Sequence, residues 1–335
     1  MANLQSSILN LQSLPSVAEM MRAAGLSPKK SLGQNFLFDL NLTGKIARTV
    51  PDIENTTVVE VGPGPGGLTR ALLMAGAKRV IAIEKDKTTA PILEQIASVA
   101  NGRLEIIFGD ALKIFCPPTG GKAADSPQGG SNSALILAAP GEHLTTPPLG
   151  GVGARGCGPV GGQFAICSNL PYNIGTELLI HWLHIMAGQQ SKITSLTLMF
   201  QKEVAQRIVA RPGDPAYGRL SVLVALTANA KILFDVPNTA FVPMPKVQSA
   251  VVQILPKNVG ANNYRAPTKS QISVGGSLPL QSVEKLTALL FGQRRKMIRG
   301  ILRDTDWAQF GLSGRERAEE LSPEKFAEIA AVAKI

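Results

Sequence analysis

Between Val58 and Gly109 the hydrophobic positions form short continuous runs, which alternate with segments whose apolar residues recur every three or four positions. Short apolar runs are typical of strands buried on both faces, and the intervening segments are typical of amphipathic helices. The alternation predicts an α/β fold with a doubly wound, mostly parallel sheet, which binds ligands at the carboxyl ends of its strands. The expected order runs through TVVEVG, LTRALLMAG, RVIAIEKD, PILEQIASVA and LEIIFGD.

The same kinds of pattern return later in the chain and end in two neighbouring strands. The closing pair, ILFDVP and VQSAVVQILP, flanks the proline-rich turn FVPMPK. Ahead of that pair we expect a strand over Phe164–Ser168, a helix from about Thr176, a strand over Ile193–Phe200, a helix over QKEVAQRIVA and a helical run from about Leu220 to Thr227.

Composition changes divide the chain further. We predict an N-terminal leader over 1–30 with one short amphipathic helix around Val17–Ala24, a main α/β domain over 31–256, a linker over 257–281 and a small, all-helical C-terminal domain over 282–335. The stretch 117–162 holds 12 Gly and 7 Pro in 46 residues, above the roughly 25–30% that marks low-complexity chain. We therefore expect an inserted mobile loop there.

The turn EVGPGPGGLTR follows the first strand of this pattern and opens a helix. Gly62, Gly64 and Gly67 satisfy G-x-G-x-x-G, and Glu84 ends the next strand, where an acid can accept hydrogen bonds from ribose hydroxyls. Asp110 ends the third strand, where its carboxylate can accept a hydrogen bond from the amino group of an adenine. The alternatives are a glycine turn that only packs strand against helix and an Asp110 that only caps a helix.

Two ligands fit this turn. A dinucleotide would place its pyrophosphate there, whereas S-adenosylmethionine (SAM) would place its methionine end there and its ribose on Glu84. Pro63 and Pro65 remove two N–H donors, which favours the smaller group over a pyrophosphate.

The stretch Asn169-Leu170-Pro171-Tyr172 ends the fourth strand. The exocyclic amine of adenine or cytosine is a poor nucleophile, because its lone pair is delocalised into the ring. The Asn169 side-chain oxygen and a backbone carbonyl, that of Leu170, would accept its two hydrogens, with Pro171 fixing the turn. Tyr172 would offer a flat face for an extruded base. The alternative is an ordinary Asn-Pro turn with a packing tyrosine.

The balance of 34 Lys and Arg against 24 Asp and Glu gives a formal net charge of +10, which favours a nucleic-acid partner. From Lys285 to Arg303 the chain carries six cations and no acid, in a segment whose pattern predicts a helix. A solvated helix face is the alternative explanation for such a run. We expect RNA phosphate contacts from Lys30, Lys202, Arg207, Arg294, Arg295, Lys296 and Arg299.

Other classes of site are disfavoured. The three cysteines have no metal-ligand spacing, and His181 with His184 offers no closed ligand set, so we expect no metal site and no disulfide framework. The chain has no apolar stretch near the roughly 18 residues of a membrane span and no secretory leader, which favours a cytoplasmic protein without a membrane partner.

Six motifs occur in a fixed order between about Ser31 and Leu302 and together resemble the small-subunit ribosomal RNA adenine dimethyltransferase family. They are QNFL, EVGPG, NLPY, FQKEVAQRIVARPGDPAYGRLSVL, FVPMPKVQSAVV and FGQRRKMIRGIL. Departures are few: Gln248 stands where the family often has Asp, and Gly292 where it often has a polar residue.

The resemblance implies a Rossmann-like SAM-dependent methyltransferase domain over 31–256 and a C-terminal RNA-binding domain. It implies transfer of two methyl groups to N6 of each of two adjacent adenosines near the 3′ end of 16S rRNA, on the 30S subunit, by a protein that we expect to be a monomer. It places Gln34, Asn35 and Leu37 beside SAM, Gly62 at the methionine end with Gly64 in the same cofactor-binding loop, Glu84 on the ribose, Asp110 at the adenine and Asn169 between cofactor and target. Phe241 would complete a base sandwich; from the residues alone it is as often a packing side chain.

Several alternatives stay open. A 23S rRNA adenine methyltransferase is the nearest, and Leu170, the FVPMPK turn and the QRRK segment favour the small-subunit enzyme. A DNA N6-adenine methyltransferase carries N-L-P-Y less often. A non-catalytic rRNA-binding assembly factor is disfavoured by intact Glu84, Asp110 and Asn169. A nicotinamide dehydrogenase shares the fold, but the chain offers no base for hydride transfer.

Overall fold

The computed structural model describes residues 2–28, 34–115, 162–188, 191–257 and 280–333. The chain forms two compact units, Met1–Ser27 with Leu40–Ser168, and Pro28–Asp39 with Asn169–Ile335. Lys30, nearly all of the inserted segment 117–162 and nearly all of the linker 257–281 lie outside the described residues. Within the described ranges, no helix combines the length and the apolar character that a membrane crossing requires.

The first unit is built on four parallel strands in the order β4-β3-β2-β5. The strand order reverses after β2, because the chain steps outward to β3 and β4 and then returns to the other side of β2. Such a reversal is the switch point at which doubly wound sheets bind ligands. The strands are β2 (Thr57–Val61), β3 (Arg79–Glu84), β4 (Leu104–Phe108) and β5 (Phe164–Asn169).

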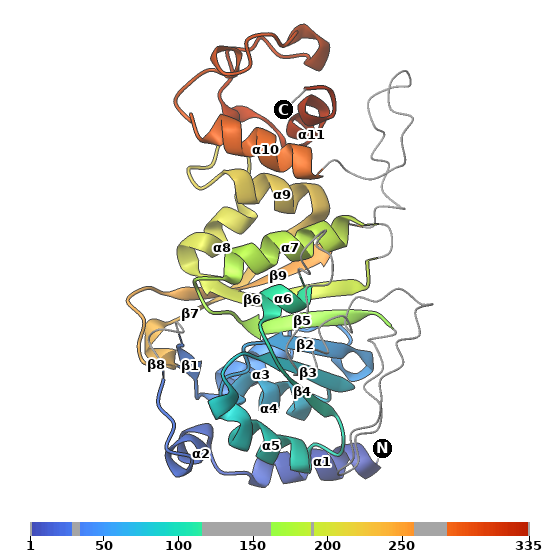
Figure 1. Cartoon of the computed structure of the whole chain (residues 1–335), viewed down its shortest axis with the longest axis vertical. Helices are drawn as coiled ribbons and strands as arrows, with labels where there is room; N and C mark the ends of the chain where they lie inside the picture. Colours follow the sequence, from blue (N-terminus) through green and yellow to red (C-terminus); the bar gives the residue numbers. More distant parts are fainter. Residues whose placement is uncertain (1, 29–33, 116–161, 189–190, 258–279, 334–335) are drawn as a thin grey trace, which may run out of the picture. The chain divides into compact units, whose positions relative to one another are not determined.

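Helices flank this sheet (Figure 1), and their apolar faces are buried as the sequence pattern predicts. In α4, for example, Leu68, Leu72 and Leu73 are each at most 4% exposed. The predicted parallel α/β core is therefore confirmed. Its helices are α3 (Leu40–Ala47), α4 (Gly67–Met74), α5 (Ala90–Val99) and α6 (Ala111–Phe115), with short 3-10 turns η2 (Ile53–Asn55) and η3 (Lys87–Thr89).

Two helices precede this core. The helix expected around Val17–Ala24 is confirmed as α2 (Val17–Ala23), which begins with a capping box between Ser16 and Glu19. The sequence pattern missed α1 (Ala2–Ser13). Its buried face includes Ser7 and Leu11, both fully buried, so a serine occupies a position where an apolar residue would have revealed the helical period.

The second unit contains the antiparallel strands β6-β9-β7 and the short antiparallel pair β1-β8. The predicted closing strand pair is thereby confirmed as β7 and β9. The strands are β1 (Phe36–Leu37), β6 (Ile193–Gln201), β7 (Ala228–Val236), β8 (Phe241–Val242) and β9 (Ser249–Pro256), and the helices α7 (Gly175–Ala187), α8 (Lys202–Val209) and α9 (Arg219–Thr227), with the 3-10 turn η4 (Asn238–Ala240).

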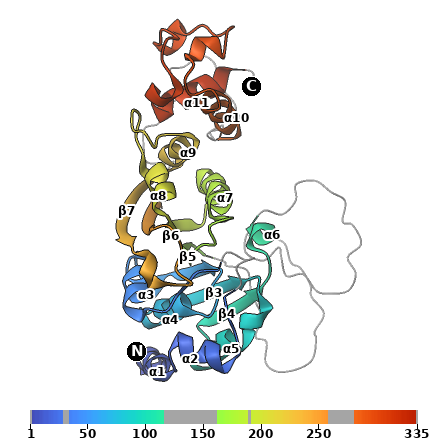
Figure 2. The same cartoon turned by 90° about the vertical axis from the view of Figure 1, so that its left-hand side faces the viewer.

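The C-terminal region of this unit is helical, but not throughout. Figure 2 shows α10 (Leu280–Phe291) and α11 (Pro323–Val332) together, joined by a segment that contains only the 3-10 turns η5 (Ile298–Gly300), η6 (Ala308–Phe310) and η7 (Ala318–Glu320). The expectation that the cations around Arg295 lie on a helix is wrong. The helix ends before Gly292, a poor helix former, and Met297 then pairs with Arg317 in an isolated β-bridge.

Candidate active site

The glycine-rich turn in the first unit depends on three glycines with left-handed backbone. Gly62, Gly64 and Gly66 have φ angles of 69°, 53° and 81°, which residues other than glycine rarely adopt. A Cβ on Gly66 would also lie 2.4 Å from the Ile96 side chain. The sequence motif assigned the third special position to Gly67, which is instead the first residue of α4. The sequence does contain two adjacent glycines, Gly66 and Gly67, either of which could be the third left-handed residue. The G-x-G-x-x-G spacing points to Gly67, whereas the structure uses Gly66.

Three N–H groups of this turn are already used within the protein. Gly62 donates to the Ile83 carbonyl at 2.9 Å, Gly64 to the Glu84 Oε2 at 2.9 Å and Gly66 to the Pro63 carbonyl at 2.9 Å. Pro63 and Pro65 have no N–H to offer. A pyrophosphate needs several free donors, and these three N–H groups do not supply them.

Glu84 lies at the carboxyl end of β3 and is 6% exposed. Its Oε2 accepts from Gly64, and its Oε1 accepts from the Asp86 N–H at 2.8 Å. Burial raises the pKa of this carboxyl, and the backbone hydrogen bonds oppose that rise. Each carboxylate oxygen has a second lone pair. Glu84 is therefore an oriented acceptor with capacity for ligand hydroxyls.

Asp110 follows β4 and is held at both oxygens. Its Oδ2 accepts from Lys85 Nζ at 2.8 Å, and its Oδ1 accepts from the Leu112 N–H at 3.1 Å at the start of α6. The hydrogen bond with Lys85 is the largest of the effects that lower the pKa of Asp110. Asp110 therefore has the helix-capping role that was the alternative from the sequence. Its carboxylate is also ionised and lies at the strand end, where the ligand role was predicted.

A side-chain bridge links the ends of β2 and β5. Their backbone ladder runs only to the pair Val59 and Ile166. Two residues further on, the buried Ser168 hydroxyl accepts from the Val61 N–H at 2.7 Å and donates to the Val61 carbonyl at 3.1 Å. The ladder stops, and the strands diverge, at the topological switch point. Sequence reasoning missed Ser168, because its role depends on a strand 107 positions away.

Asn169 is positioned by the segment of the second unit that precedes β1. Its amide nitrogen donates to the Asn35 carbonyl at 3.1 Å. This contact fixes the orientation of the amide and leaves its oxygen as an acceptor, as the predicted role requires. The structure therefore brings together Asn35 and Asn169, which the sequence separates by 134 positions.

The backbone after Asn169 is also oriented. The Pro171 carbonyl accepts from the N–H groups of Ile174 and Gly175, at 3.2 Å and 3.1 Å, as α7 begins. In the described part of the chain no hydrogen bond ends on the Leu170 carbonyl. Pro171 is thus committed to the helix, whereas the Leu170 carbonyl keeps the acceptor capacity that was predicted for it.

Two aromatic residues differ in accessibility. Tyr172 is partly buried, and its hydroxyl shares a 2.8 Å hydrogen bond with Ser249 Oγ at the start of β9. Burial raises the pKa of this phenol. Phe241 is only 2% exposed, and its backbone lies opposite Leu37 in the β1–β8 pair. This burial is what the packing alternative expects, and the place of Phe241 in a base sandwich stays a prediction. Gln34, which was predicted to lie beside SAM, directly precedes Asn35 in the chain.

The predicted RNA-binding cations fall into two groups. Three have acidic partners: Lys202 pairs with Asp235 at 2.6 Å, Arg207 with Glu203, and Arg294 with Glu319. The other three are exposed and have no acidic partner among the described residues: Arg295, Lys296 and Arg299. Within the described ranges, no three His, Cys, Asp or Glu side chains lie together in a group that could hold a metal ion.

A parallel sheet that reverses between β2 and β5, with a glycine turn at one strand end and an acid at the next, defines the class of Rossmann-like enzymes. Comparisons with known proteins narrow the class. A family model described as ribosomal RNA adenine dimethylase matches residues 25–266. The chain belongs to this family. The resemblance inferred from the sequence motifs is confirmed, and with it the assignment of an enzyme that methylates adenine in ribosomal RNA.

Curated relatives agree with this family, and a solved structure shares the fold. The chain is 42% identical over 322 residues to "Ribosomal RNA small subunit methyltransferase A" of Mesorhizobium japonicum, covering 95% of this chain and 98% of the relative. It is 43% identical over 326 residues to the protein of the same name from Chelativorans sp., covering 96% and 99%. A dimethyladenosine transferase from Plasmodium falciparum shares the fold, with a TM-score of 0.58 at 20% identity over 88% of this chain and 95% of that one.

Proposed function

We propose that this protein transfers methyl groups from SAM to N6 of two adjacent adenosines in the 3′-terminal hairpin loop of 16S rRNA, and that it does so on the 30S particle during small-subunit assembly. We further propose that it acts as a monomer in the cytoplasm. Support comes from the small-subunit names of relatives that are 42–43% identical over nearly the whole chain. The observation that carries the chemistry is the Asn169 amide, whose nitrogen is held by the Asn35 carbonyl.

The residues at the strand ends of the first unit fit SAM better than a dinucleotide. The N–H groups of Gly62, Gly64 and Gly66 are engaged, so the turn presents a neutral surface with little capacity for a pyrophosphate. Glu84 supplies an oriented carboxylate for ribose hydroxyls, and Asp110 an ionised one for an adenine amino group. Asn35 and Leu37 would contact the same ligand. When bound, SAM supplies the methyl group on its sulfonium.

The protein's part in the reaction is to hold the target amine. The Asn169 side-chain oxygen and the Leu170 carbonyl accept the two hydrogens of N6, which directs the nitrogen lone pair toward the methyl carbon. The amine proton leaves for solvent after the nitrogen has gained positive charge, so no side chain with a matched pKa is needed. Tyr172 supports the extruded base, and such stacking contributes roughly 1–3 kcal/mol.

One assay tests the proposal against its alternatives. The protein is incubated with tritiated SAM and, separately, with 30S subunits that lack the modification, naked 16S rRNA, 50S subunits and duplex DNA, and labelled adenosines are mapped. We expect label on two adjacent adenosines of the 30S subunit. Label on 50S subunits alone would support the 23S enzyme, label on DNA alone a DNA methyltransferase, and binding without label a non-catalytic assembly factor.

A variant isolates the amine acceptor. Asn169→Ala should reduce the rate of methylation of 30S subunits by roughly 10²–10³-fold, the usual effect of losing one oriented hydrogen-bonding group where charge develops in the transition state. Its affinity for the 30S particle should be unchanged. The matched control is Asn229→Ala, an exposed asparagine on β7, which should leave the rate unchanged. Equal rates for Asn169→Ala and the unsubstituted protein would remove Asn169 from the mechanism.

A further inference from the structure

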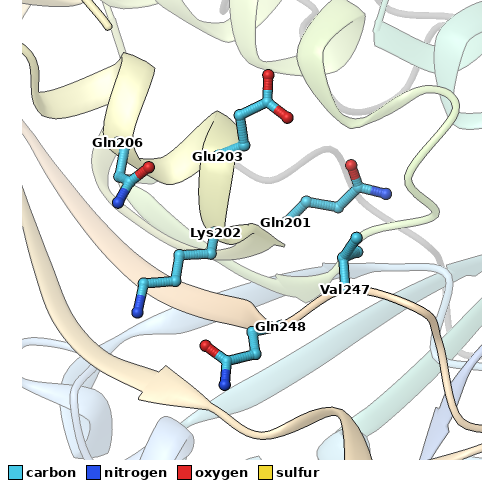
Figure 3. A pocket seen from close by; sticks show the side chains of 6 residues that line it. All are labelled: Gln201, Lys202, Glu203, Gln206, Val247 and Gln248. Atoms are coloured by element: carbon cyan, nitrogen blue, oxygen red, sulfur yellow. The ribbon is translucent and has the colours of Figure 1, made fainter. Parts of the chain in front are cut away.

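A hollow of about 330 Å³ lies in the second unit, between the start of α8 and the segment just before β9 (Figure 3). Its size is at the lower end of the range of small-molecule sites. Three of its six lining side chains are primary amides, and only one is apolar. The lining residues are Gln201, Lys202, Glu203, Gln206, Val247 and Gln248.

The hollow is connected through the backbone to a residue that contacts Tyr172 of the candidate active site. The Lys202 N–H donates to the Gln248 carbonyl at 2.9 Å, which joins its two walls. The next residue, Ser249, lies opposite Gln201 in the β6–β9 ladder and shares the 2.8 Å hydrogen bond with the Tyr172 hydroxyl. The residue whose side chain contacts Tyr172 therefore directly follows Gln248, which lines the hollow, in the same backbone segment.

The charges around the hollow cancel. Lys202 pairs with Asp235 at 2.6 Å, and Glu203 pairs with Arg207 one helical turn later. A neutral site rich in amides suits a neutral ligand with several donors and acceptors, and a nucleobase edge has that character.

In Figure 3 the ends of the Lys202, Gln206 and Gln248 side chains point to one side, and the Glu203 carboxylate points away from them. All three are at least partly exposed, so they are free to reorient toward a ligand. The ion pair of Lys202 is on the surface and holds the ammonium weakly. The Lys202 ammonium can therefore leave Asp235 and pair with a phosphate oxygen instead.

We propose that this hollow binds the base of the nucleotide next to the target adenosine, and that the amides of Gln206 and Gln248 read its edge. The inference rests on the proposed function, in which that neighbour is itself an adenosine. An amide oxygen accepts from N6 of adenine while the amide nitrogen donates to a ring nitrogen. Guanine presents an oxygen acceptor where adenine has N6, so it would leave the amide oxygen unpaired.

The test uses the full-length protein, SAM and 30S subunits reconstituted with 16S rRNA in which one or the other target adenosine is guanosine. Methylation of the remaining adenosine is measured by mass spectrometry after nuclease digestion. For one of the two substitutions, the unsubstituted protein should lose at least about tenfold in rate, because a good amide–base pair discriminates by that much or more. The double variant Gln206→Ala, Gln248→Ala should be slow on the natural RNA and show no further loss on the guanosine RNA.

Gln95→Ala, an exposed glutamine on α5, is the matched control and should behave like the unsubstituted protein. If the double variant keeps the full discrimination, or if neither guanosine slows the unsubstituted protein, the inference is wrong. Absence of methylation on natural 30S subunits by the unsubstituted protein would instead contradict the proposed function. Thermal unfolding of the variants confirms folding, which substitution of exposed side chains should preserve.

Discussion

Glu60 is a buried acid beside the glycine turn, and sequence reasoning gave it no role. It lies on β2, is 1% exposed and accepts a hydrogen bond from the Thr69 hydroxyl at 2.6 Å. Burial raises its pKa from 4.5 to about 8, and the nearby charge of Glu84 adds to the rise. At neutral pH the folded protein therefore holds this carboxyl as a neutral acid, which the apolar surroundings tolerate.

This pKa predicts a pH-dependent stability. Between pH 4.5 and about pH 8, Glu60 keeps a proton in the folded chain that it releases in the unfolded chain. The free energy of unfolding therefore falls as pH rises through this range, by roughly 1.4 kcal/mol per pH unit. Glu60→Gln, a neutral isostere, should remove this slope. Urea unfolding of variant and unsubstituted protein between about pH 5 and about pH 8 should show a gain that grows with pH.

Glu94→Gln, on the exposed face of α5, is the control for Glu60→Gln and should leave the pH profile unchanged. Parallel pH profiles for Glu60→Gln and the unsubstituted protein would mean that Glu60 is ionised in the folded state.

Motifs predicted the residues whose chemistry is local, and missed those whose partners are distant. Asn169 and Glu84 could be proposed from the sequence because each ends a strand beside a recognisable motif. The Asn35 carbonyl, Ser168 and Ser249 were not assigned, since each acts through a contact with a segment more than 70 positions away. A backbone carbonyl in particular has no sequence signature, because every residue carries one.

At the scale of elements, the buried Arg70 and the partly buried Arg103 hold the N-terminal helices against the α/β core. Arg70 on α4, 2% exposed, donates to the carbonyls of Pro15, Leu14 and Gln12 at 2.7, 3.0 and 3.3 Å. A cation at these carbonyls also opposes the negative end of the α1 dipole. Arg103 donates to the Ser7 hydroxyl of α1 at 2.9 Å. The predicted leader thus contains helices that pack on the core.

Removing Arg70 should release these helices. Arg70→Met keeps much of the side-chain volume but leaves three carbonyls without their donor, and we expect a loss of roughly 2–3 kcal/mol in the free energy of unfolding. Limited proteolysis should then cut within 1–27 faster than in the unsubstituted protein. The exposed Arg22 offers the control Arg22→Ala, with a change below about 0.5 kcal/mol. Unchanged proteolysis of Arg70→Met would show that apolar contacts alone hold α1.

On the scale of the whole molecule, the net charge of +10 predicted a polyanionic partner, and the structure separates paired from unpaired cations. Arg294 is engaged by Glu319 and by the Pro215 carbonyl, whereas Arg295, Lys296 and Arg299 are exposed without acidic partners in the described part of the chain. Unpaired cations give the larger gain on meeting phosphate, since no ion pair must first be broken.

Replacing Arg295, Lys296 and Arg299 together with Ala should weaken binding to 30S subunits and reduce the slope of log affinity against log salt by roughly 2–3, if each neutralises one phosphate. Filter binding over a series of KCl concentrations measures this slope. The control removes the same charge from exposed cations of the first unit, Arg22, Lys78 and Lys87. An equal loss for both triple variants would show that net charge acts, rather than this surface.

The sequence by itself determined the class of fold and the family, because these depend on periodicity and on short motifs whose geometry is set within a few residues. Tertiary structure decided which acceptors are free and which cations are paired. It also placed Asn35 on Asn169, docked α1 on Arg70 and joined the amide-lined hollow to Tyr172. These are contacts between segments far apart in the chain, and only the folded chain brings such segments together.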